Sequence, residues 1–487
     1  MSLRDSAVKG VLWTSIGTVG AGLLNFILTM ILARVLSPSD YGLLELLAIF
    51  TILSECFIDS GFSQAVIKDQ NASQSDLSSV FFFNLTIALV LYAGLFFAAP
   101  LIANFYHEPS LVKLSRFVFL VIIFHSCSII QNANFSRNLQ FRPQAIASIA
   151  AIIIAGTTAG IMAFKGFGVW ALATNMVLFA FLKMLFYWLF SSWKPSFVVS
   201  FQSIKKYFKF GVNLLIQGLI DKFVTNLESL MIGRVYTKTD LGYFSQARKL
   251  DSYITQTSTS VIQKVTYPIL AKLGNDNNQL KNGYRRVLGI TMFAMVPILF
   301  FVAASADNLL YVFFGPQWNN SVPFLRLWSI CGLLVSFHSI FINIFLVTNN
   351  TKLLLYLSII KQVVRLIVIF SLISISVLAL MYGIVGVGVF SAIIYCYFGG
   401  KLIRYKAIEV IKDLLPTVGI AFISALAVFC LGWLMSSYNR FIVFALQVVF
   451  MFVLYWLGSF VLKNKSYLEI KGILSSLVAS FVIRKNR

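Results

Sequence analysis

Long apolar runs alternate with short polar segments along the whole chain of 487 residues. Because a helix needs about 20 mostly apolar residues to cross the hydrocarbon core of a bilayer, each run can span a membrane. We therefore predict an all-α polytopic membrane protein with about fourteen transmembrane helices. They are expected near residues 10–33, 41–65, 78–105, 112–134, 144–164, 167–191, 208–233, 241–263, 286–314, 322–347, 353–379, 382–402, 414–436 and 440–462.

One short pattern occurs twice, 200 positions apart. Residues 32–42 read LARVLSPSDYG and residues 232–242 read IGRVYTKTDLG, and each lies between two apolar runs. The identical positions are Arg34 and Arg234, Val35 and Val235, Asp40 and Asp240, and Gly42 and Gly242. Each copy is expected to form a turn between two helices at a membrane edge, so the duplication predicts a transporter built from two repeats.

The charged residues of these turns have structural interpretations. Asp40 and Asp240 fall in the first turn of the following helix, where a carboxylate can cap free backbone N–H groups. Arg34 and Arg234 end the preceding helices and can extend to lipid headgroups. The turns are therefore expected to position the repeats and not to bind the substrate.

A second internal match supports the same division. GFGVWALA at 166–173 resembles GVGVFSAI at 386–393, and these glycines are expected to let helices pack closely. Corresponding segments are six spans apart, an even number, so the two repeats should enter the membrane in the same direction. We predict a six-helix bundle at 1–195, a second at 196–407, two additional helices at 408–463 and a cytoplasmic amphipathic tail helix at 464–487.

Composition and charge exclude other classes of protein. The chain is 59% hydrophobic and 11% charged, whereas soluble domains average about 45–50% and about 25%. The net charge is +22. With the N-terminus inside, 25 of the 39 Lys and Arg residues fall inside, 8 fall outside and six lie within spans. This asymmetry predicts that both termini are cytoplasmic, and it explains the basic excess without a nucleic-acid partner.

The cysteines do not indicate a metal site. All five lie inside apolar spans without metal-ligand spacing, so we expect them to pack the helices.

With these segments in view, the chain resembles the polysaccharide-export branch of the multidrug/oligosaccharidyl-lipid/polysaccharide exporter superfamily. Within that branch it looks like O-antigen-type lipid-linked oligosaccharide flippases. The resemblance is carried by LARVLSPSDYGLLELLAIF with SGFSQAVIKD after it, NLESLMIGRVYTKTDLGYFSQARKL, VTYPILAKL and LLYVFFGPQWNNSVPFLRLWSI. These segments cover both halves of the chain in family order.

The resemblance implies two six-helix bundles that face each other across a central cavity. It implies an inward–outward switch that carries a polyprenyl-diphosphate-linked glycan of O-antigen, capsule or exopolysaccharide type to the outer leaflet of a bacterial inner membrane. The implied partners are the lipid-linked oligosaccharide, membrane lipid, a glycan polymerase and chain-length proteins. No cofactor is implied except H⁺ or Na⁺ as a coupling ion.

Charged residues inside the predicted spans are the candidates for transport. A charge at the bilayer centre costs about 2.5–3.5 kcal/mol on insertion scales, so it usually faces a cavity or a partner. The basic candidates for binding the diphosphate are Lys222, Arg248, Lys249, Lys361 and Arg365. The acidic candidates for ion coupling are Glu55, Asp59, Asp221, Glu228 and Asp251. Alternatively, these charges pair to hold helices together, as Asp251 can with Arg248.

Two rival functions remain open at this stage. A cation-coupled multidrug exporter should have an acidic or aromatic cavity, whereas the predicted spans hold six basic residues, Lys183 among them. A membrane glycan polymerase or ligase needs a large catalytic loop on the outside, and no predicted outer turn is long enough. The sequence therefore favours a transporter of an anionic substrate over an enzyme.

Overall fold

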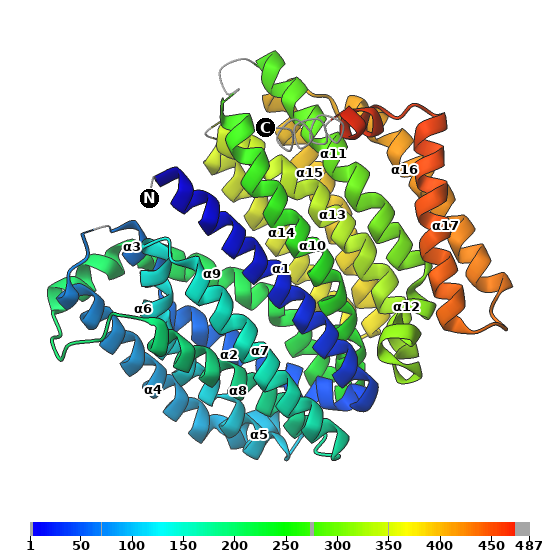
Figure 1. The fold of residues 1–487 in the computed structure, drawn as a ribbon. Coiled ribbons are helices and arrows are strands. Elements are labelled where there is room, and N and C mark those ends of the chain that lie inside the picture. The colour runs from blue at the N-terminus through cyan, green and yellow to red at the C-terminus, as the bar shows by residue number, and fades with distance from the viewer. Residues whose placement is uncertain (1–2, 70, 273–276, 349, 473–487) are drawn as a thin grey trace, which may run out of the picture. The chain divides into compact units, whose positions relative to one another are not determined.

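The computed structural model describes residues 3–69, 71–272, 277–348 and 350–472. Every regular element in these ranges is helical. The helices are α1 (Leu3–Val35), α2 (Pro38–Asp59), α3 (Phe62–Lys68), α4 (Gln74–Phe105), α5 (Leu111–Val118), α6 (Leu120–Arg137), α7 (Phe141–Phe164), α8 (Val169–Phe190), α9 (Phe201–Val235), α10 (Lys238–Lys272), α11 (Asn277–Ala304), α12 (Ala306–Phe314), the 3₁₀ helix η1 (Pro316–Ser321), α13 (Val322–Val347), α14 (Thr351–Leu372), α15 (Val377–Leu402), α16 (Ala407–Leu434) and α17 (Arg440–Val461) (Figure 1). The predicted all-α fold is confirmed.

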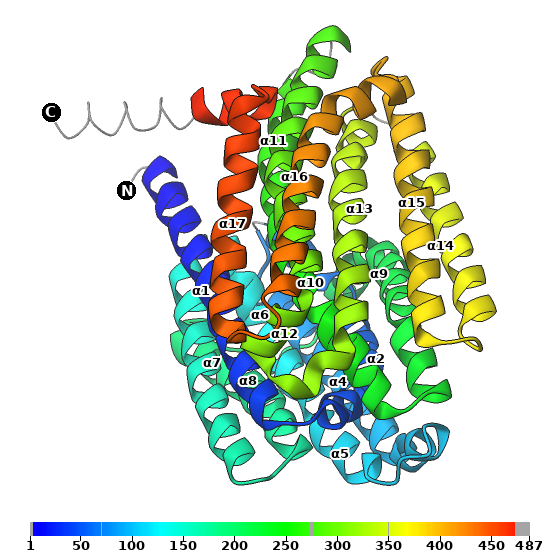
Figure 2. The ribbon, with the colours of Figure 1, turned by 90° about the vertical axis from the view of Figure 1, so that its right-hand side faces the viewer.

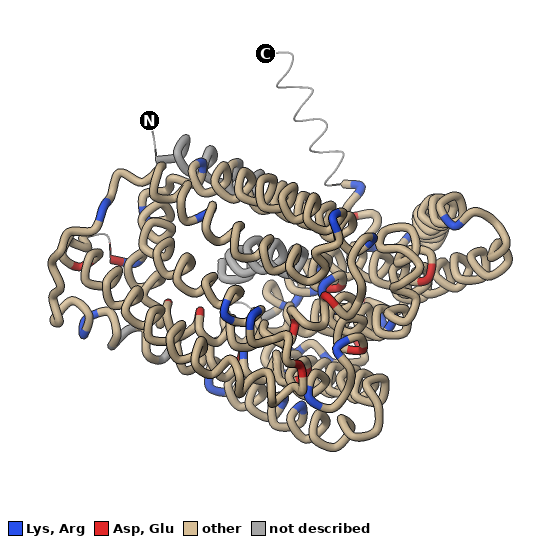
Figure 3. Tube along the Cα trace, turned by 90° about the horizontal axis from the view of Figure 1, so that it is seen from below, with Lys and Arg blue, Asp and Glu red and all other residues tan. Residues whose placement is uncertain are grey.

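Twelve segments of the described chain are long and apolar enough to cross a membrane. The protein is therefore a multi-pass membrane protein, and long stretches of its trace carry no charged residue (Figure 3). The predicted count of fourteen is not confirmed. The seventh and eighth predicted spans do form helices, α9 and α10, but neither is apolar enough to be counted. Asp221, Lys222 and Glu228 on α9 lower its hydropathy, as Arg248 and Lys249 do on α10.

Contacts divide the chain into two compact units, residues 1–245 and 246–487, with the boundary inside α10. The first unit therefore contains all of α9 and the start of α10 in addition to α1–α8. The second contains the rest of α10 and α11–α17 (Figure 2). The predicted domain boundaries follow the sequence repeats and stay a prediction. Most of the predicted tail helix lies outside the described residues, which end at Gly472.

In the first unit, α7 packs between α1 and α8 because one row of its side chains is small. The buried alanines of that row recur every four residues: Ala147, Ala151, Ala155, Ala159 and Ala163. At Gly156 an added Cβ would lie 2.8 Å from the Leu28 side chain of α1. Small residues let helix backbones approach, which is how helices associate tightly in lipid.

In the second unit, α15 packs on α13 in a similar way. Added Cβ atoms at Gly388 and Gly399 would lie 3.0 Å from Leu334 and 3.1 Å from Phe341 of α13. The packing role expected for the second GxG segment therefore holds at Gly388. The first segment differs, because Gly166 and Gly168 have φ angles of 81° and 54° in the turn before α8. They serve the turn, and an added Cβ at Gly168 would also lie 3.1 Å from the Asp40 carboxylate at the start of α2.

Candidate functional site

The two duplicated turns begin their helices with the same reciprocal cap. The Asp40 backbone N–H donates to the Ser37 hydroxyl at 3.3 Å, and the Ser37 N–H donates to the Asp40 carboxylate at 2.9 Å. The second turn repeats both bonds between Thr237 and Asp240, at 3.1 and 3.3 Å. This capping box satisfies N–H groups that a helix start otherwise leaves free. The sequence repeat is thus also a repeat of local structure.

Gly42 and Gly242 bring the two turns into direct backbone contact. An added Cβ at Gly42 would lie 1.7 Å from the Lys238 carbonyl oxygen, and one at Gly242 would lie 1.9 Å from the Pro38 carbonyl oxygen. The contact is therefore reciprocal, because the first turn of α2 and the first turn of α10 each present a glycine to the other. No side chain larger than hydrogen fits there. We call Pro38, Gly42, Lys238 and Gly242 the glycine crossing.

Residues at the end of α4 hold the second turn in place. Lys238 Nζ pairs with Glu108 Oε2 at 2.9 Å. Arg234 Nη1 lies 2.6 Å from His107 Nε2, and its guanidinium lies 5.2 Å from the centre of the Phe105 ring. The exposed Arg234 is thus engaged with protein groups.

Below the glycine crossing, α2 and α9 run antiparallel along a polar seam. Near one end an added Cβ at Gly233 would lie 2.3 Å from Leu46, and the Ser229 hydroxyl donates to Glu45 at 3.2 Å. Near the other end an added Cβ at Gly211 would lie 2.0 Å from the Ser60 carbonyl oxygen. The seam is therefore tight at both ends.

The helix is interrupted between α2 and α3, inside the second predicted span. Ser60 and Gly61 have φ angles of 44° and 73°, which an α-helix cannot accommodate. Asp59 ends α2 and accepts a hydrogen bond from the Ser63 backbone N–H at 3.0 Å. Asp59 thus supports the start of α3, a structural role that the span pattern did not predict.

Four of the predicted acidic and basic candidates lie near one another along the seam. Glu55, Asp59, Asp221 and Lys222 all lie within electrostatic range of Cys56. Glu55 and Asp59 are half-buried, whereas Asp221 and Lys222 are exposed on α9. The structure therefore brings together candidates that are more than 160 positions apart in the sequence.

Two residues that the sequence analysis did not assign to the site belong to this cluster. Lys183 of α8 lies within electrostatic range of Glu55, and His125 of α6 lies within range of Glu55, Asp59 and Lys183. The Lys183 ammonium also lies 5.9 and 5.6 Å from the ring centres of Phe179 and Tyr187. The sequence contained a signal for Lys183, since it is the one charged residue among the 22 residues of α8. We call Glu55, Asp59, His125, Lys183, Asp221 and Lys222 the seam cluster.

Glu228 does not share the surroundings of Asp221, although the two lie seven positions apart and therefore on one face of α9. Its exposed fraction is 0%, and it lies next to the buried Ser229 that contacts α2. Glu228 is therefore positioned within the packing of the first unit, away from the exposed part of α9.

The other predicted candidates belong to the second unit. Asp251 of α10 is buried against α13, where an added Cβ at Gly332 would lie 2.3 Å from its Oδ1. That oxygen accepts no hydrogen bond from the described residues. Arg248 is half-buried and Lys249 is exposed. Pairing of Arg248 with Asp251 stays a prediction.

Lys361 and Arg365 are half-buried on α14. They share a helix face with Ser358, whose hydroxyl lies 3.0 Å from the Tyr395 hydroxyl of α15. Lys361 also lies within electrostatic range of His338 on α13. Both cations therefore face polar and aromatic groups of the second unit. Within the described residues, no group of three or more His, Cys, Asp or Glu side chains could hold a metal ion.

The model of the family described as "Polysaccharide biosynthesis protein" matches residues 31–323, which extend from the first duplicated turn to the start of α13. The chain belongs to this family.

Similar proteins occur in several bacteria. The chain is 24% identical to the teichuronic acid biosynthesis protein TuaB of Bacillus subtilis, over 68% of this chain and 69% of that protein. It is also 24% identical to the succinoglycan biosynthesis transport protein ExoT of Rhizobium meliloti, over 67% and 66%. The third is the lipopolysaccharide biosynthesis protein WzxC of Escherichia coli, with 24% identity over 69% of each chain.

Two solved structures show the fold. The chain matches the lipid II flippase MurJ in an inward closed conformation, with a TM-score of 0.75 and 15% identity over 93% of this chain and 99% of that one. It also matches an inward-facing multidrug resistance MATE family transporter, with a TM-score of 0.59 and 15% identity over 81% and 98%. The chain therefore has the fold of this transporter superfamily, as the sequence resemblance implied.

Proposed function

We propose that the protein is a flippase that moves a polyprenyl-diphosphate-linked oligosaccharide from the inner to the outer leaflet by alternating access. The family match carries the proposal, because it covers more than half of the chain. The fold supports it, since both structural relatives are membrane transporters by name. The named relatives are proteins of teichuronic acid biosynthesis, succinoglycan biosynthesis transport and lipopolysaccharide biosynthesis.

The orientation is part of the proposal. The excess of Lys and Arg on one side places both termini in the cytoplasm of a bacterial inner membrane. The glycine crossing then lies at the outer face. The substrate carries its diphosphate in from the cytoplasmic leaflet, and a glycan polymerase and chain-length proteins act on the product.

Basic residues are proposed to bind the diphosphate. Lys222 in the first unit, and Arg248, Lys249, Lys361 and Arg365 in the second, supply point charges and bidentate guanidinium groups, which suit phosphate. Four of the five lie in the second unit, so that unit should make most of the phosphate contacts.

The seam cluster is proposed to couple the switch to H⁺ or Na⁺. Glu55 lies within electrostatic range of Lys183, so a bound cation must compete with a charge that the protein already holds there. A ligand shifts a conformational equilibrium only as far as it binds one state better than the other. A change in the separation of Lys183 and Glu55 is the difference between states that this cluster offers.

A deletion strain tests the function. We expect loss of surface glycan together with accumulation of lipid-linked repeat units on the inner leaflet, and we expect both to be reversed by the full-length gene. The fold is shared with drug transporters, so the same strain should be tested against a panel of organic cations. Normal surface glycan with altered drug sensitivity would contradict the flippase proposal and favour a drug exporter.

A further inference from the structure

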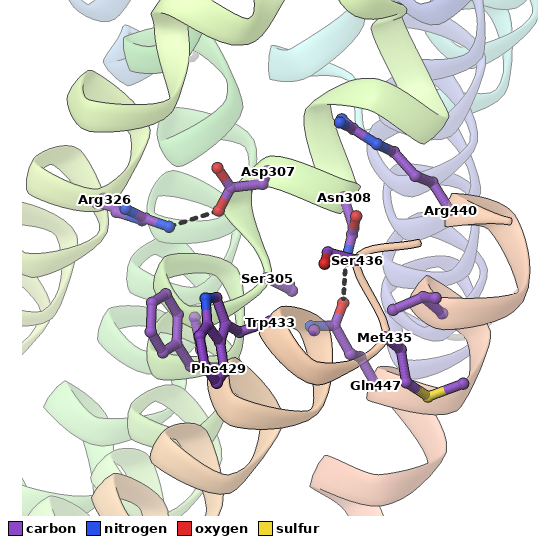
Figure 4. Close-up of a pocket in the computed structure, with 13 residues that line it drawn as sticks. Ser305, Asp307, Asn308, Arg326, Phe429, Trp433, Met435, Ser436, Arg440 and Gln447 are labelled. Atoms are coloured by element: carbon purple, nitrogen blue, oxygen red, sulfur yellow. Dashed lines mark hydrogen bonds and ion pairs between the residues drawn. The ribbon is translucent and has the colours of Figure 1, made fainter. Parts of the chain in front are cut away.

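A pocket of about 300 Å³ opens in the second unit, where α12, α13, α16 and α17 come together near their ends. Its polar lining comes from Asp307, Asn308, Arg326, Ser436, Arg440 and Gln447, and Phe429 and Trp433 add aromatic surface (Figure 4). None of these residues is among the candidates for substrate transport discussed above. The pocket lies beside the α16–α17 turn, so it is at the end of the helices and not at their middle.

Buried hydrogen bonds hold the walls of the pocket in position. Gln447 of α17 is only 1% exposed. Its amide donates to the Val428 carbonyl oxygen of α16 at 3.0 Å and accepts from the Asn308 amide of α12 at 3.1 Å. An added Cβ at Gly432 would lie 2.4 Å from the Gln447 amide nitrogen. One buried side chain thus ties three helices together, and the pocket is formed before any ligand arrives.

The two arginines of the pocket differ in whether a carboxylate pairs with them. Arg326 donates to the Asp307 carboxylate and lies 5.5 Å from the Phe429 ring centre. Arg440 lies 4.3 Å from the ring centre of Tyr311, and no carboxylate of the described residues pairs with it. A guanidinium carries five N–H donors in a planar fork. Arg440 therefore offers an uncompensated positive charge and free donors at the pocket.

The rim of the pocket is apolar and exposed. Trp433, Leu434 and Tyr438 at the α16–α17 turn are 72%, 71% and 65% exposed. In a membrane protein, exposed Trp and Tyr at helix ends lie at the level of the lipid headgroups. The pocket thus places a cationic fork next to the surface where lipid chains begin.

We propose that this pocket binds the phosphoryl headgroup of a membrane lipid. The phosphate is held by Arg440, the hydroxyl groups of the headgroup contact Asn308 and Ser436, and the acyl or prenyl chain lies along the apolar rim. A volume near the lower end of ligand pockets, about 300–1,000 Å³, fits a headgroup and not a whole oligosaccharide. The site is separate from the transport pathway proposed above and does not depend on it.

The test measures lipid binding to the purified full-length protein by native mass spectrometry. Phosphatidylglycerol is titrated, with phosphatidylcholine and inorganic phosphate as comparisons. We expect Arg440→Gln to weaken phosphatidylglycerol binding about tenfold or more, because it removes charge-assisted hydrogen bonds to the phosphate. Arg440→Lys keeps the charge without the fork and should fall in between.

A second variant should act in the opposite direction. Asp307→Asn releases Arg326 from its carboxylate, so phosphatidylglycerol should bind several-fold more tightly. A merely misfolded protein would not bind better, which separates this result from a structural effect. Lys113→Gln is the matched control, because it removes one exposed charge from α5 in the other unit.

A polyprenyl phosphate arm identifies the source of the headgroup. Preferential binding of polyprenyl phosphate through Arg440 assigns the pocket to the carrier lipid, and preferential binding of phosphatidylglycerol assigns it to bulk phospholipid. The proposal is overturned if Arg440→Gln and Lys113→Gln reduce binding equally, or if Asp307→Asn does not strengthen it. Equal binding of free inorganic phosphate would also overturn it, because the apolar rim would then have no part.

Discussion

At the scale of single residues, two carboxylates four positions apart on α2 have different surroundings. Asp59 accepts a hydrogen bond from the start of α3, whereas Glu55 faces the charge of Lys183. The sequence predicted both as one pair on one face, since spacing alone does not reveal what each carboxylate meets. It did not predict that Lys183 lies within electrostatic range of Glu55, because the two residues are 128 positions apart and approach only through tertiary packing.

Electrostatic coupling between Glu55 and Lys183 can be measured by a double-mutant cycle on glycan export. Glu55→Gln or Lys183→Gln alone should reduce export strongly, because each leaves an uncompensated charge inside the membrane protein. The double variant should recover part of the export, which is the signature of coupling between neighbours. Asp59→Asn is the control for structure. It should lower thermal stability by about 1 kcal/mol through the weakened cap while export falls no further than protein amount. Additive losses in the cycle would show that Glu55 and Lys183 act independently.

An ion pair outside the spans should make stability depend on pH. Asp69, after α3, accepts hydrogen bonds from Lys206 Nζ at 2.6 Å and the Tyr207 hydroxyl at 2.9 Å, and the Lys206 bond lowers the pKa of Asp69. A lowered pKa stabilises the folded state above the ordinary aspartate value of about 3.9. That contribution, about 1 kcal/mol or less for so exposed a pair, is lost as pH falls through the folded-state pKa. Between pH 6 and pH 3, the free energy of unfolding of the wild-type protein should therefore fall by up to about 1 kcal/mol more than that of Asp69→Asn, and its melting temperature should fall slightly further. Parallel melting curves would contradict this assignment.

At the scale of helices, the duplicated turns were predictable and their contact was not. The turn residues indicated where α1, α2, α9 and α10 begin and end, because capping is local chemistry. The sequence of the turns could not show that Gly42 and Gly242 each contact the other turn, since that contact depends on tertiary packing. The prediction counted α9 and α10 as spans, but neither is apolar enough to be counted, because charged residues such as Asp221, Lys222 and Asp251 interrupt them.

Alanine substitution tests the glycine crossing. Gly42→Ala and Gly242→Ala should each destabilise the protein by about 1–3 kcal/mol or more, because a methyl group would overlap a backbone carbonyl oxygen that cannot rotate away. Gly94→Ala on α4 is the matched control, since no atom lies within 4 Å of its added Cβ and alanine favours a helix. The measurement is the thermal unfolding midpoint of purified protein. Equal unfolding midpoints for Gly42→Ala and Gly94→Ala would contradict a stabilising role for the glycine crossing.

At the scale of the whole molecule, the composition and the alternation of apolar runs were enough to predict a helical membrane transporter. The segments that carry the family resemblance lie in both halves, and the family match spans residues 31–323. The seam cluster of the first unit and the cations of the second could not be derived from hydropathy. Each consists of residues that hydropathy scores only as interruptions of an apolar run.

The central claim is that this chain itself moves a lipid-linked oligosaccharide across a bilayer. The most direct measurement reconstitutes the purified full-length protein into vesicles that carry lipid-linked oligosaccharide extracted from the deletion strain. A glycosidase that cannot cross the membrane then reports how fast glycan from the inner leaflet becomes accessible outside. The account predicts a rate well above that of protein-free vesicles and a marked decrease with Glu55→Gln. Folded, inserted wild-type protein that leaves the rate at the protein-free level would contradict it.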